Sequence, residues 1–421
     1  MRYKHSASRI YIVITLVVLV GWLSAALLLQ KSSGASSSPD HITLTWRGNP
    51  ATSQTITWRT GLTESVGKVK YIEAAAVQSN SSDFLTVVTQ QDVLSTNLGN
   101  MTIHSVTLDN LRPGVKYIYQ VGDGAHWSRQ YSFVTASSNL KPFKFLVFGD
   151  SQGTNYLVWR AVINKAYQVN PDAAFAINVG DLVDVGLDYR EWKAWFNAVQ
   201  GIADTIPIMP LAGNHETYTP DKGLSMPLYF MAQFKLPDNG PEGLKGLVYS
   251  FDYGDMHFSM LDSQENEERN FVANIIEKQK EWLDKDLKAT NKHWKVVFIH
   301  RPPFHNRPQD DDENLRDAFV PIIDKHKVDI VFSGHDHVYA RSYPLRDGAK
   351  MKSPAEGSIY ITAGRTGTKT FQRALAKEWN EVFYNPQDEP NYLTVDVKQD
   401  TLTVKAVRVS GGLIDEFSII K

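Results

Sequence analysis

Five apolar stretches of this chain each end in a polar motif whose side chains could hold metal ions. The stretches are rich in β-branched and aromatic residues, and each is followed by glycine or a turn, which is typical of buried strands. Parallel strands gather ligands at their carboxyl ends, so these motifs should meet. Asp, Asn and His form the donor set of a two-metal hydrolytic centre. The motifs are Gly149-Asp150, Gly180-Asp181, Gly213-Asn214-His215, His300 and Gly334-His335-Asp336-His337.

The prediction of a metal centre rests on the five motifs together, because each motif alone is ambiguous. A Gly-Asp pair after a strand is usually a turn closed by a side-chain hydrogen bond. A strand-end histidine such as His300 is more often a hydrogen-bonded polar residue than a ligand. Five such motifs in one chain, each at a predicted strand end, favour a metal centre over five unrelated turns.

Helical and extended patterns alternate in residues 142–421, which we predict to be the catalytic domain. Strands at 143–148, 174–179 and 206–212 enclose helices at 155–169 and 189–202, and this βαβαβ order predicts a right-handed, largely parallel layer. The same patterns predict an antiparallel pair at 247–252 and 257–261, helices at 267–290 and 313–325, and strands at 294–299, 329–332, 358–363, 392–397 and 402–409.

Residues 39–137 have the pattern of an all-β sandwich. Seven short alternating runs are separated by Gly, Pro, Asn and Ser. The segment 108–123 resembles the late part of a fibronectin type III module, in which Tyr117 would lie near a strand corner and hydrogen-bond back to the chain. Folds of this class serve many functions, and we favour a spacer without chemistry over a carbohydrate- or partner-binding role.

Residues 1–38 combine a cationic start, an apolar run and a Ser-rich linker. The uncharged run at 10–29 would span roughly 30 Å as a helix, and Arg2, Lys4 and Arg9 before it would stay inside the cell. We favour a membrane anchor over a cleaved signal peptide, because the run is longer than a typical signal core. Either segment predicts an extracellular or cell-surface protein, anchored to the membrane or secreted after cleavage.

The composition excludes several classes of protein. A formal net charge of −2 with no long basic run argues against nucleic-acid binding. The chain has no cysteine, which rules out disulfides, thiolate ligands and cysteine nucleophiles. A hydrophobic content of 42% is ample for two folded cores.

Taken in order, these motifs resemble those of the calcineurin-like metallophosphoesterases. Over residues 40–421 the chain resembles the purple acid phosphatase branch, which joins a fibronectin-like domain to this catalytic layer. The resemblance implies an α/β fold, in which a metallophosphoesterase αββα sandwich follows an all-β fibronectin III-like sandwich. It also implies a phosphate-ester substrate and two metal ions drawn from iron, zinc and manganese.

The resemblance assigns a role to each motif residue. His215 matches a histidine that is not a ligand and that gives a proton to the leaving group or stabilises the phosphoryl oxygens. The implied ligands are Asp150 and His337 for the first metal, Asn214, His300 and His335 for the second, and Asp181 as the bridge between them.

Two positions depart from the pattern of purple enzymes and their relatives. Purple enzymes carry a tyrosine three residues after the bridging aspartate, where this chain has Asp184. Other metallophosphoesterases carry a histidine two residues after the first aspartate, where this chain has Gln152. The amide oxygen of Gln152 could bind the first metal, or its amide could hydrogen-bond to a ligand; both remain open.

Four further residues could shape the substrate pocket, with packing as the alternative for each: Arg301, His305, Tyr218 and Tyr339. The resulting prediction is a metal-dependent phosphoric ester hydrolase of the acid phosphatase type, which uses a hydroxide generated by the metals. The alternatives are a phosphodiesterase of the same superfamily and a catalytically silent cell-surface binding protein. The complete ligand set favours an enzyme.

Overall fold

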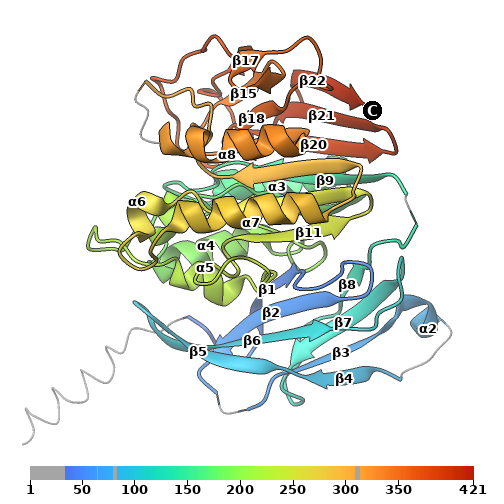
Figure 1. The fold of residues 1–421 in the computed structure, drawn as a ribbon. Helices are drawn as coiled ribbons and strands as arrows, with labels where there is room; N and C mark the ends of the chain where they lie inside the picture. The colour runs from blue at the N-terminus through green and yellow to red at the C-terminus, as the bar shows by residue number, and fades with distance from the viewer. Residues whose placement is uncertain (1–33, 64, 79–82, 140, 309–312) are drawn as a thin grey trace, which may run out of the picture.

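The computed structural model describes residues 34–63, 65–78, 83–139, 141–308 and 313–421. The predicted membrane or signal segment at 10–29 lies outside these residues. Among the helices described, none combines the length and the apolar character needed to cross a bilayer. The described chain forms an N-terminal β-sandwich followed by a larger α/β sandwich (Figure 1).

The N-terminal sandwich is built from eight strands and one short helix: β1 (Asp40–Thr45), β2 (Gln54–Gly61), β3 (Lys68–Glu73), α2 (Ala74–Gln78), β4 (Leu85–Val88), β5 (Gln90–Thr96), β6 (Gly99–Leu108), β7 (Lys116–Gly122) and β8 (Tyr131–Val134). One sheet has the order β1-β2-β6-β5 and the other β4-β3-β7-β8. The sequence did not predict β5, because its side chains are mostly exposed and lack an apolar alternation. Tyr117 takes the predicted corner position, where its hydroxyl accepts a hydrogen bond from Arg112 N at 2.9 Å.

Two further sheets form the α/β sandwich. The five-stranded sheet has the order β10 (Ala173–Asn178), β9 (Phe143–Phe148), β20 (Asn391–Lys398), β21 (Thr401–Arg408) and β22 (Leu413–Ile420). The seven-stranded sheet has the order β11 (Tyr249–Tyr253), β12 (Met256–Leu261), β13 (Trp294–Ile299), β14 (Ile330–Ser333), β18 (Ile359–Ala363), β15 (Tyr339–Ser342) and β19 (Asn380–Tyr384). A small hairpin pairs β16 (Leu345–Arg346) with β17 (Ala349–Lys350).

Helices cover the outer faces of both sheets. In Figure 1, α7 (Ile275–Ala289) and α8 (Glu313–His326) lie side by side over one sheet, and α3 (Leu157–Val169) and α4 (Tyr189–Val199) lie behind the other. The shorter helices are η1 (Asn214–Thr217), α5 (Leu228–Gln233) and α6 (Glu265–Glu268). This order of layers is the αββα sandwich.

Two predicted elements differ from the structure. The predicted strand at 206–212 is an extended segment that contributes a single bridge between Ile208 and Ala176. The predicted helix at 267–290 is interrupted before α7, where Asn274 adopts a left-handed backbone with φ of 58°. An asparagine tolerates this conformation, but a regular helix does not continue through it.

Stacked phenylalanines fill the space between the two sheets. Phe145 and Phe175, from β9 and β10, stack with their ring centroids 5.1 Å apart. Phe251 and Phe258, from β11 and β12, stack at 4.6 Å. Edge contacts of 5.6 Å between Phe175 and Phe258 join the two pairs across the interface. Aromatic packing of this kind stabilises the sandwich beyond the burial of apolar area.

Candidate active site

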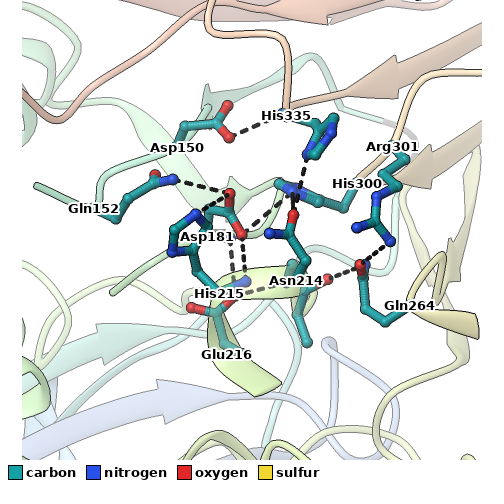
Figure 2. Close-up of polar contacts among 12 residues, drawn as sticks. Asp150, Gln152, Asp181, Asn214, His215, Glu216, Gln264, His300, Arg301 and His335 are labelled. Carbon is teal, nitrogen blue, oxygen red and sulfur yellow. Dashed lines mark hydrogen bonds and ion pairs between the residues drawn. The ribbon is translucent and has the colours of Figure 1, made fainter. Parts of the chain in front are cut away.

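The loops after β9, β10, β13 and β14 bring the predicted ligands together, although these strands belong to two different sheets (Figure 2). Asp181, His300 and His335 form one buried group whose ligand atoms all lie within 4.8 Å of one another. Asp150, Asp181 and His337 form a second group under the same limit. Asp181 belongs to both groups, which is the geometry of a bridging carboxylate.

Asn214, the first residue of η1, lies beside the group formed by Asp181, His300 and His335. Its Oδ1 lies 3.1 Å from His335 Nδ1 and 3.3 Å from His300 Nε2. Its Nδ2 donates to the hydroxyl of Tyr218 at 2.7 Å, so the amide oxygen faces the two imidazoles. The Nδ1 of His300 donates to Val179 O at 2.7 Å, which leaves Nε2 to face the centre.

The backbone is left-handed at several predicted ligands. Such conformations cost free energy in residues other than glycine, and they persist at sites where the surrounding structure holds them. Here they turn each side chain sharply inward at the end of a strand. The φ angles are 40° at Asp150, 53° at Asp181, 65° at His335 and 56° at His337.

Two glycines allow the ligand loops to approach one another. A Cβ atom at Gly213 would lie 2.2 Å from Asp181 Oδ1. A Cβ atom at Gly180 would lie 2.4 Å from His300 Nδ1. Larger residues at either position would push a ligand out of place, so the glycine before each polar residue is a packing requirement.

Glu216 holds the loop that carries Asp181. Its Oε2 accepts hydrogen bonds from Asp181 N at 2.9 Å and Gly213 N at 2.6 Å. Its Oε1 accepts from Leu182 N at 2.8 Å and Val183 N at 3.1 Å. Burial and the charge of Asp181 raise the pKa of Glu216 to about 8, although backbone N–H groups favour its ionised form.

The donor set fits a pair of metal ions. Asp150 Oδ2, Gln152 Oε1 and His337 Nδ1 are buried and have no hydrogen-bond partner among the described residues. Burial and the charge of Asp181 raise the pKa of Asp150, because two carboxylates this close repel each other without a cation. Burial lowers the pKa of His337 to about 3, which keeps its imidazole in the neutral form that binds metals. Bound metal ions would give these buried oxygens and this neutral imidazole the partners that they lack.

His215 lies beside this centre with its ring orientation fixed. Its Nδ1 donates to Asp184 O at 2.7 Å, and its Nε2 lies 4.0 Å from Asp181 Oδ2. Burial opposes protonation, but the charge of Asp181 and the hydrogen bond with Asp184 outweigh it and raise the pKa of His215 to about 9. The raised pKa favours the protonated form of His215, and its role as a proton donor stays a prediction.

Asp184 occupies the position of the tyrosine found in purple enzymes. Its Oδ1 pairs with Lys369 Nζ and lies 3.2 Å from His215 Nδ1. The hydrogen bond with His215 and the ion pair with Lys369 lower the pKa of Asp184 to about 2. Asp184 thus contacts the imidazole of His215.

Gln152 directs its amide nitrogen toward the carboxylate of Asp181. Its Nε2 donates to Asp181 Oδ2 at 2.9 Å and lies 3.5 Å from His337 Nε2. Its side chain is buried, and its Oε1 is among the unpartnered atoms. Of the two alternatives for Gln152, the structure shows the hydrogen bond to a predicted ligand. Binding of a metal by Oε1 stays a prediction.

The four predicted pocket residues have other partners among the described residues. Arg301 contacts Glu267 through both terminal nitrogens, at 2.9 and 2.8 Å. Tyr218 orients Asn214, and Tyr339 donates to Asp415 Oδ2 at 2.7 Å. His305 Nδ1 lies 3.0 Å from Arg307 O. Direct contact of these residues with substrate stays a prediction.

Two residues of the site were not predicted from the sequence. Glu216 directly follows the Gly-Asn-His motif, and a buried acid at that position could have been suspected as a support for the turn. Lys369 lies six residues after β18, too far from the end of that strand to be marked by a strand-end pattern. No local signal in the sequence places Lys369 beside Asp184.

Comparisons with known proteins agree with this geometry. Residues 39–135 match the family model of the purple acid phosphatase N-terminal domain, and residues 143–339 match that of the calcineurin-like phosphoesterases. The chain is 26% identical over 385 residues to acid phosphatase type 7 of Mus musculus, covering 82% of this chain and 84% of that protein. It is 29% identical over 287 residues to the Fe(3+)-Zn(2+) purple acid phosphatase 12 of Arabidopsis thaliana, covering 63% and 59%.

A solved structure shows the same fold. The purple acid phosphatase from seeds of yellow lupin (Lupinus luteus) superimposes with a TM-score of 0.75 at 18% identity, covering 91% of this chain and 74% of that one. The α/β sandwich with its shared aspartate is that of a calcineurin-like phosphoesterase. Together with its N-terminal domain, the chain belongs to the purple acid phosphatase-like family.

Proposed function

We propose that this protein is a dinuclear-metal phosphohydrolase that acts on phosphate esters. One observation carries the proposal: two buried ligand groups share Asp181, and their remaining members come from three separate loops, after β9, β13 and β14. A buried cluster of carboxylates and imidazoles is costly unless it holds cations. The acid phosphatases among the relatives support the same reaction class.

Each residue of the site has a role in this reaction. Two ions held by these ligands would supply hydroxide by lowering the pKa of a bound water and would balance the charge of the phosphate. Asp150 and Asp181 would hold the two ions, while the imidazoles of His300, His335 and His337 would add no negative charge and so leave the site net positive for an anionic substrate. His215 donates a proton from Nε2 to the leaving oxygen, with its tautomer fixed by the Asp184 carbonyl.

The ions are proposed to be iron, zinc or manganese. Hard carboxylate oxygens and imidazole nitrogens suit all three. Asp184 offers no phenolate, so the preference of purple enzymes for ferric iron at the first position need not hold here.

Hydrolysis of two model substrates tests the proposal. We expect the metal-loaded protein to hydrolyse p-nitrophenyl phosphate, and a chelator to abolish turnover until metal is restored. The rate on bis-p-nitrophenyl phosphate separates a monoesterase from a phosphodiesterase. Absence of turnover on both substrates with iron, zinc and manganese would instead favour a silent binding protein.

We also propose that the N-terminal segment places the enzyme outside the cell. The support is the uncharged run at 10–29, which follows three cationic residues. Full-length protein should remain in the membrane fraction after carbonate extraction or appear in the medium after cleavage, whereas a chain starting at residue 39 should do neither. Intact full-length protein in the cytosolic fraction would contradict this placement.

A further inference from the structure

The turn between β5 and β6 brings a side chain of the N-terminal sandwich to the start of α4. This turn consists of Asn97 and Leu98, and Leu98 packs against the apolar cluster that contains the core of the catalytic domain. Asn97 N donates to the hydroxyl of Tyr229 at 3.1 Å, which holds the turn against α5. The sandwich therefore contacts the catalytic domain here through a fixed polar residue.

The side-chain amide of Asn97 binds two consecutive residues of the catalytic domain. Its Nδ2 donates to Asp188 Oδ1 at 2.9 Å, and its Oδ1 accepts from Tyr189 N at 2.9 Å. Asp188 is 7% exposed and Tyr189 is fully buried, so both bonds are shielded from water. Asp188 is also the N-cap of α4, where its side chain accepts from Arg190 N. Because an amide offers a donor and an acceptor together, Asn97 fixes this position through both.

The loop that ends at Asp188 is the loop that orients His215. Asp184 O accepts the hydrogen bond from His215 Nδ1 at 2.7 Å. Gly186 N, further along the same loop, donates to His215 O at 2.8 Å. Asn97 therefore holds the far end of a short loop whose middle is bonded to both the ring and the backbone of His215.

We propose that Asn97 is a positioning residue for catalysis, which acts from the N-terminal sandwich through the loop that orients His215. This inference rests on the proposed function, in which His215 Nε2 gives a proton to the leaving oxygen. If the loop shifts, the carbonyl of Asp184 moves with it, and the ring turns away from the leaving oxygen. A misplacement of about 1 Å can lower a catalytic rate by about 10²-fold.

Two aryl phosphates with different leaving groups test the inference. Phenol is a weaker acid than p-nitrophenol, so the departure of phenolate depends more on a proton donor. We expect Asn97→Ala to retain its metal ions, to lower kcat about tenfold for phenyl phosphate and to lower it less than about threefold for p-nitrophenyl phosphate. KM should change little. Asn100→Ala, at an exposed position on the same hairpin, is the matched control and should leave both rates unchanged.

A double-mutant comparison separates positioning of His215 from a general loss of stability. In the His215→Ala background, Asn97→Ala should lower kcat for phenyl phosphate less than about twofold, because the group that it positions is already gone. If Asn97→Ala does not fold, Tyr229→Phe takes its place in both experiments. Tyr229→Phe removes only the hydroxyl that accepts from Asn97 N, and a smaller loss with the same dependence on the leaving group is expected.

Three results would overturn the inference while leaving the proposed function intact. Equal losses on the two substrates, or an undiminished loss in the His215→Ala background, would show that Asn97 only stabilises the fold. Unchanged kcat for phenyl phosphate in the folded variant would show that the loop needs no support from the sandwich. A metal-loaded wild-type protein that hydrolyses neither substrate would instead refute the proposed function itself.

Discussion

Asp184 is the residue at which this site differs from that of purple enzymes. The colour of those enzymes comes from a tyrosine phenolate bound to ferric iron, and this chain has a carboxylate at that position. Among the described residues, two tyrosine hydroxyls hydrogen-bond to the loops of the site. Tyr156 donates to Glu191 at 2.5 Å, and Tyr218 accepts a hydrogen bond from Asn214, so both hydroxyls already have a partner.

We therefore expect the iron-loaded protein to lack an intense visible charge-transfer band. An absorption spectrum of the oxidised, iron-loaded protein checks this directly. Appearance of a strong purple chromophore would show that a tyrosine reaches the metal in the loaded state.

His215 should be needed for turnover but not for metal binding. Its ring is held by Asp184 O and belongs to neither ligand group. We expect His215→Ala to keep both metals and to lower kcat by about 10²- to 10⁴-fold, the usual contribution of a proton donor. Metal analysis and steady-state kinetics on the same preparation measure both effects. The exposed His126→Ala serves as the control, and loss of metal from the His215 variant would refute the assigned role.

The ligand residues were accessible to sequence reasoning because each directly follows an apolar run. Asp150, Asp181 and His300 were singled out because all five motifs lie at predicted strand ends, and their roles as ligands came from the family resemblance. Lys369 could not be found in this way, because its position depends on backbone contacts with Gly149 and Asp150, more than two hundred residues away in sequence. Residues placed by long-range pairing leave no local pattern.

At the scale of elements, the sequence predicted most strands of the catalytic domain, and the family resemblance implied two sheets, but neither assigned each strand to its sheet. Apolar runs such as β9 and β13 are both buried and look alike in sequence. Their partners are decided by packing, as when β9 pairs with the distant β20 in antiparallel register. Local periodicity carries no information on such pairing.

A buried histidine ties the β11–β12 hairpin to α7. His257 lies 2.7 Å from Asp252 and 2.9 Å from Asp286, and Ser259 donates to the same carboxylate of Asp286. Lys292 lies 3.8 Å from Asp252 on the solvent side. Burial lowers the pKa of His257, but the hydrogen bonds to both carboxylates outweigh it and raise the pKa to about 9.

This cluster predicts a loss of stability in alkaline solution. Because the pKa of His257 is raised in the folded state, its contribution is complete below its unfolded value of about 6.5 and is lost as the pH rises through about 9. We expect the free energy of unfolding to fall by on the order of 2 kcal/mol more in wild type than in His257→Gln between pH 6 and pH 9.5. Urea unfolding at both pH values measures this difference. Parallel pH dependence in the two proteins would contradict it.

At the scale of the whole molecule, the N-terminal sandwich shares its packing with the catalytic domain. Trp46 follows β1 and is 1% exposed, and its ring lies 5.3 Å from Phe175 and 5.5 Å from Tyr253. Asn97 Oδ1 accepts a hydrogen bond from Tyr189 N at the start of α4, five residues after Asp184. The sandwich therefore packs against the catalytic domain and stabilises it. The predicted role as a spacer did not include this contact.

Removing the indole of Trp46 should destabilise both domains. We expect Trp46→Ala to lower the free energy of unfolding by about 3–5 kcal/mol, the usual cost of deleting a buried tryptophan. Denaturant unfolding followed by near-ultraviolet circular dichroism measures it. Trp127→Ala, at a half-buried position on the sandwich, should cost far less. Equal effects of the two substitutions would mean that the domains do not share a core.

The account depends most on Asp181 as the carboxylate common to two metal ions. Its most direct test is the metal content of wild-type protein and Asp181→Asn, measured by inductively coupled plasma mass spectrometry after loading and removal of free metal. We predict two ions per wild-type chain and near-complete loss of both in the variant, because one side chain serves both ligand groups. Two retained ions in Asp181→Asn, or fewer than two in the fully loaded wild type, would contradict the bridge.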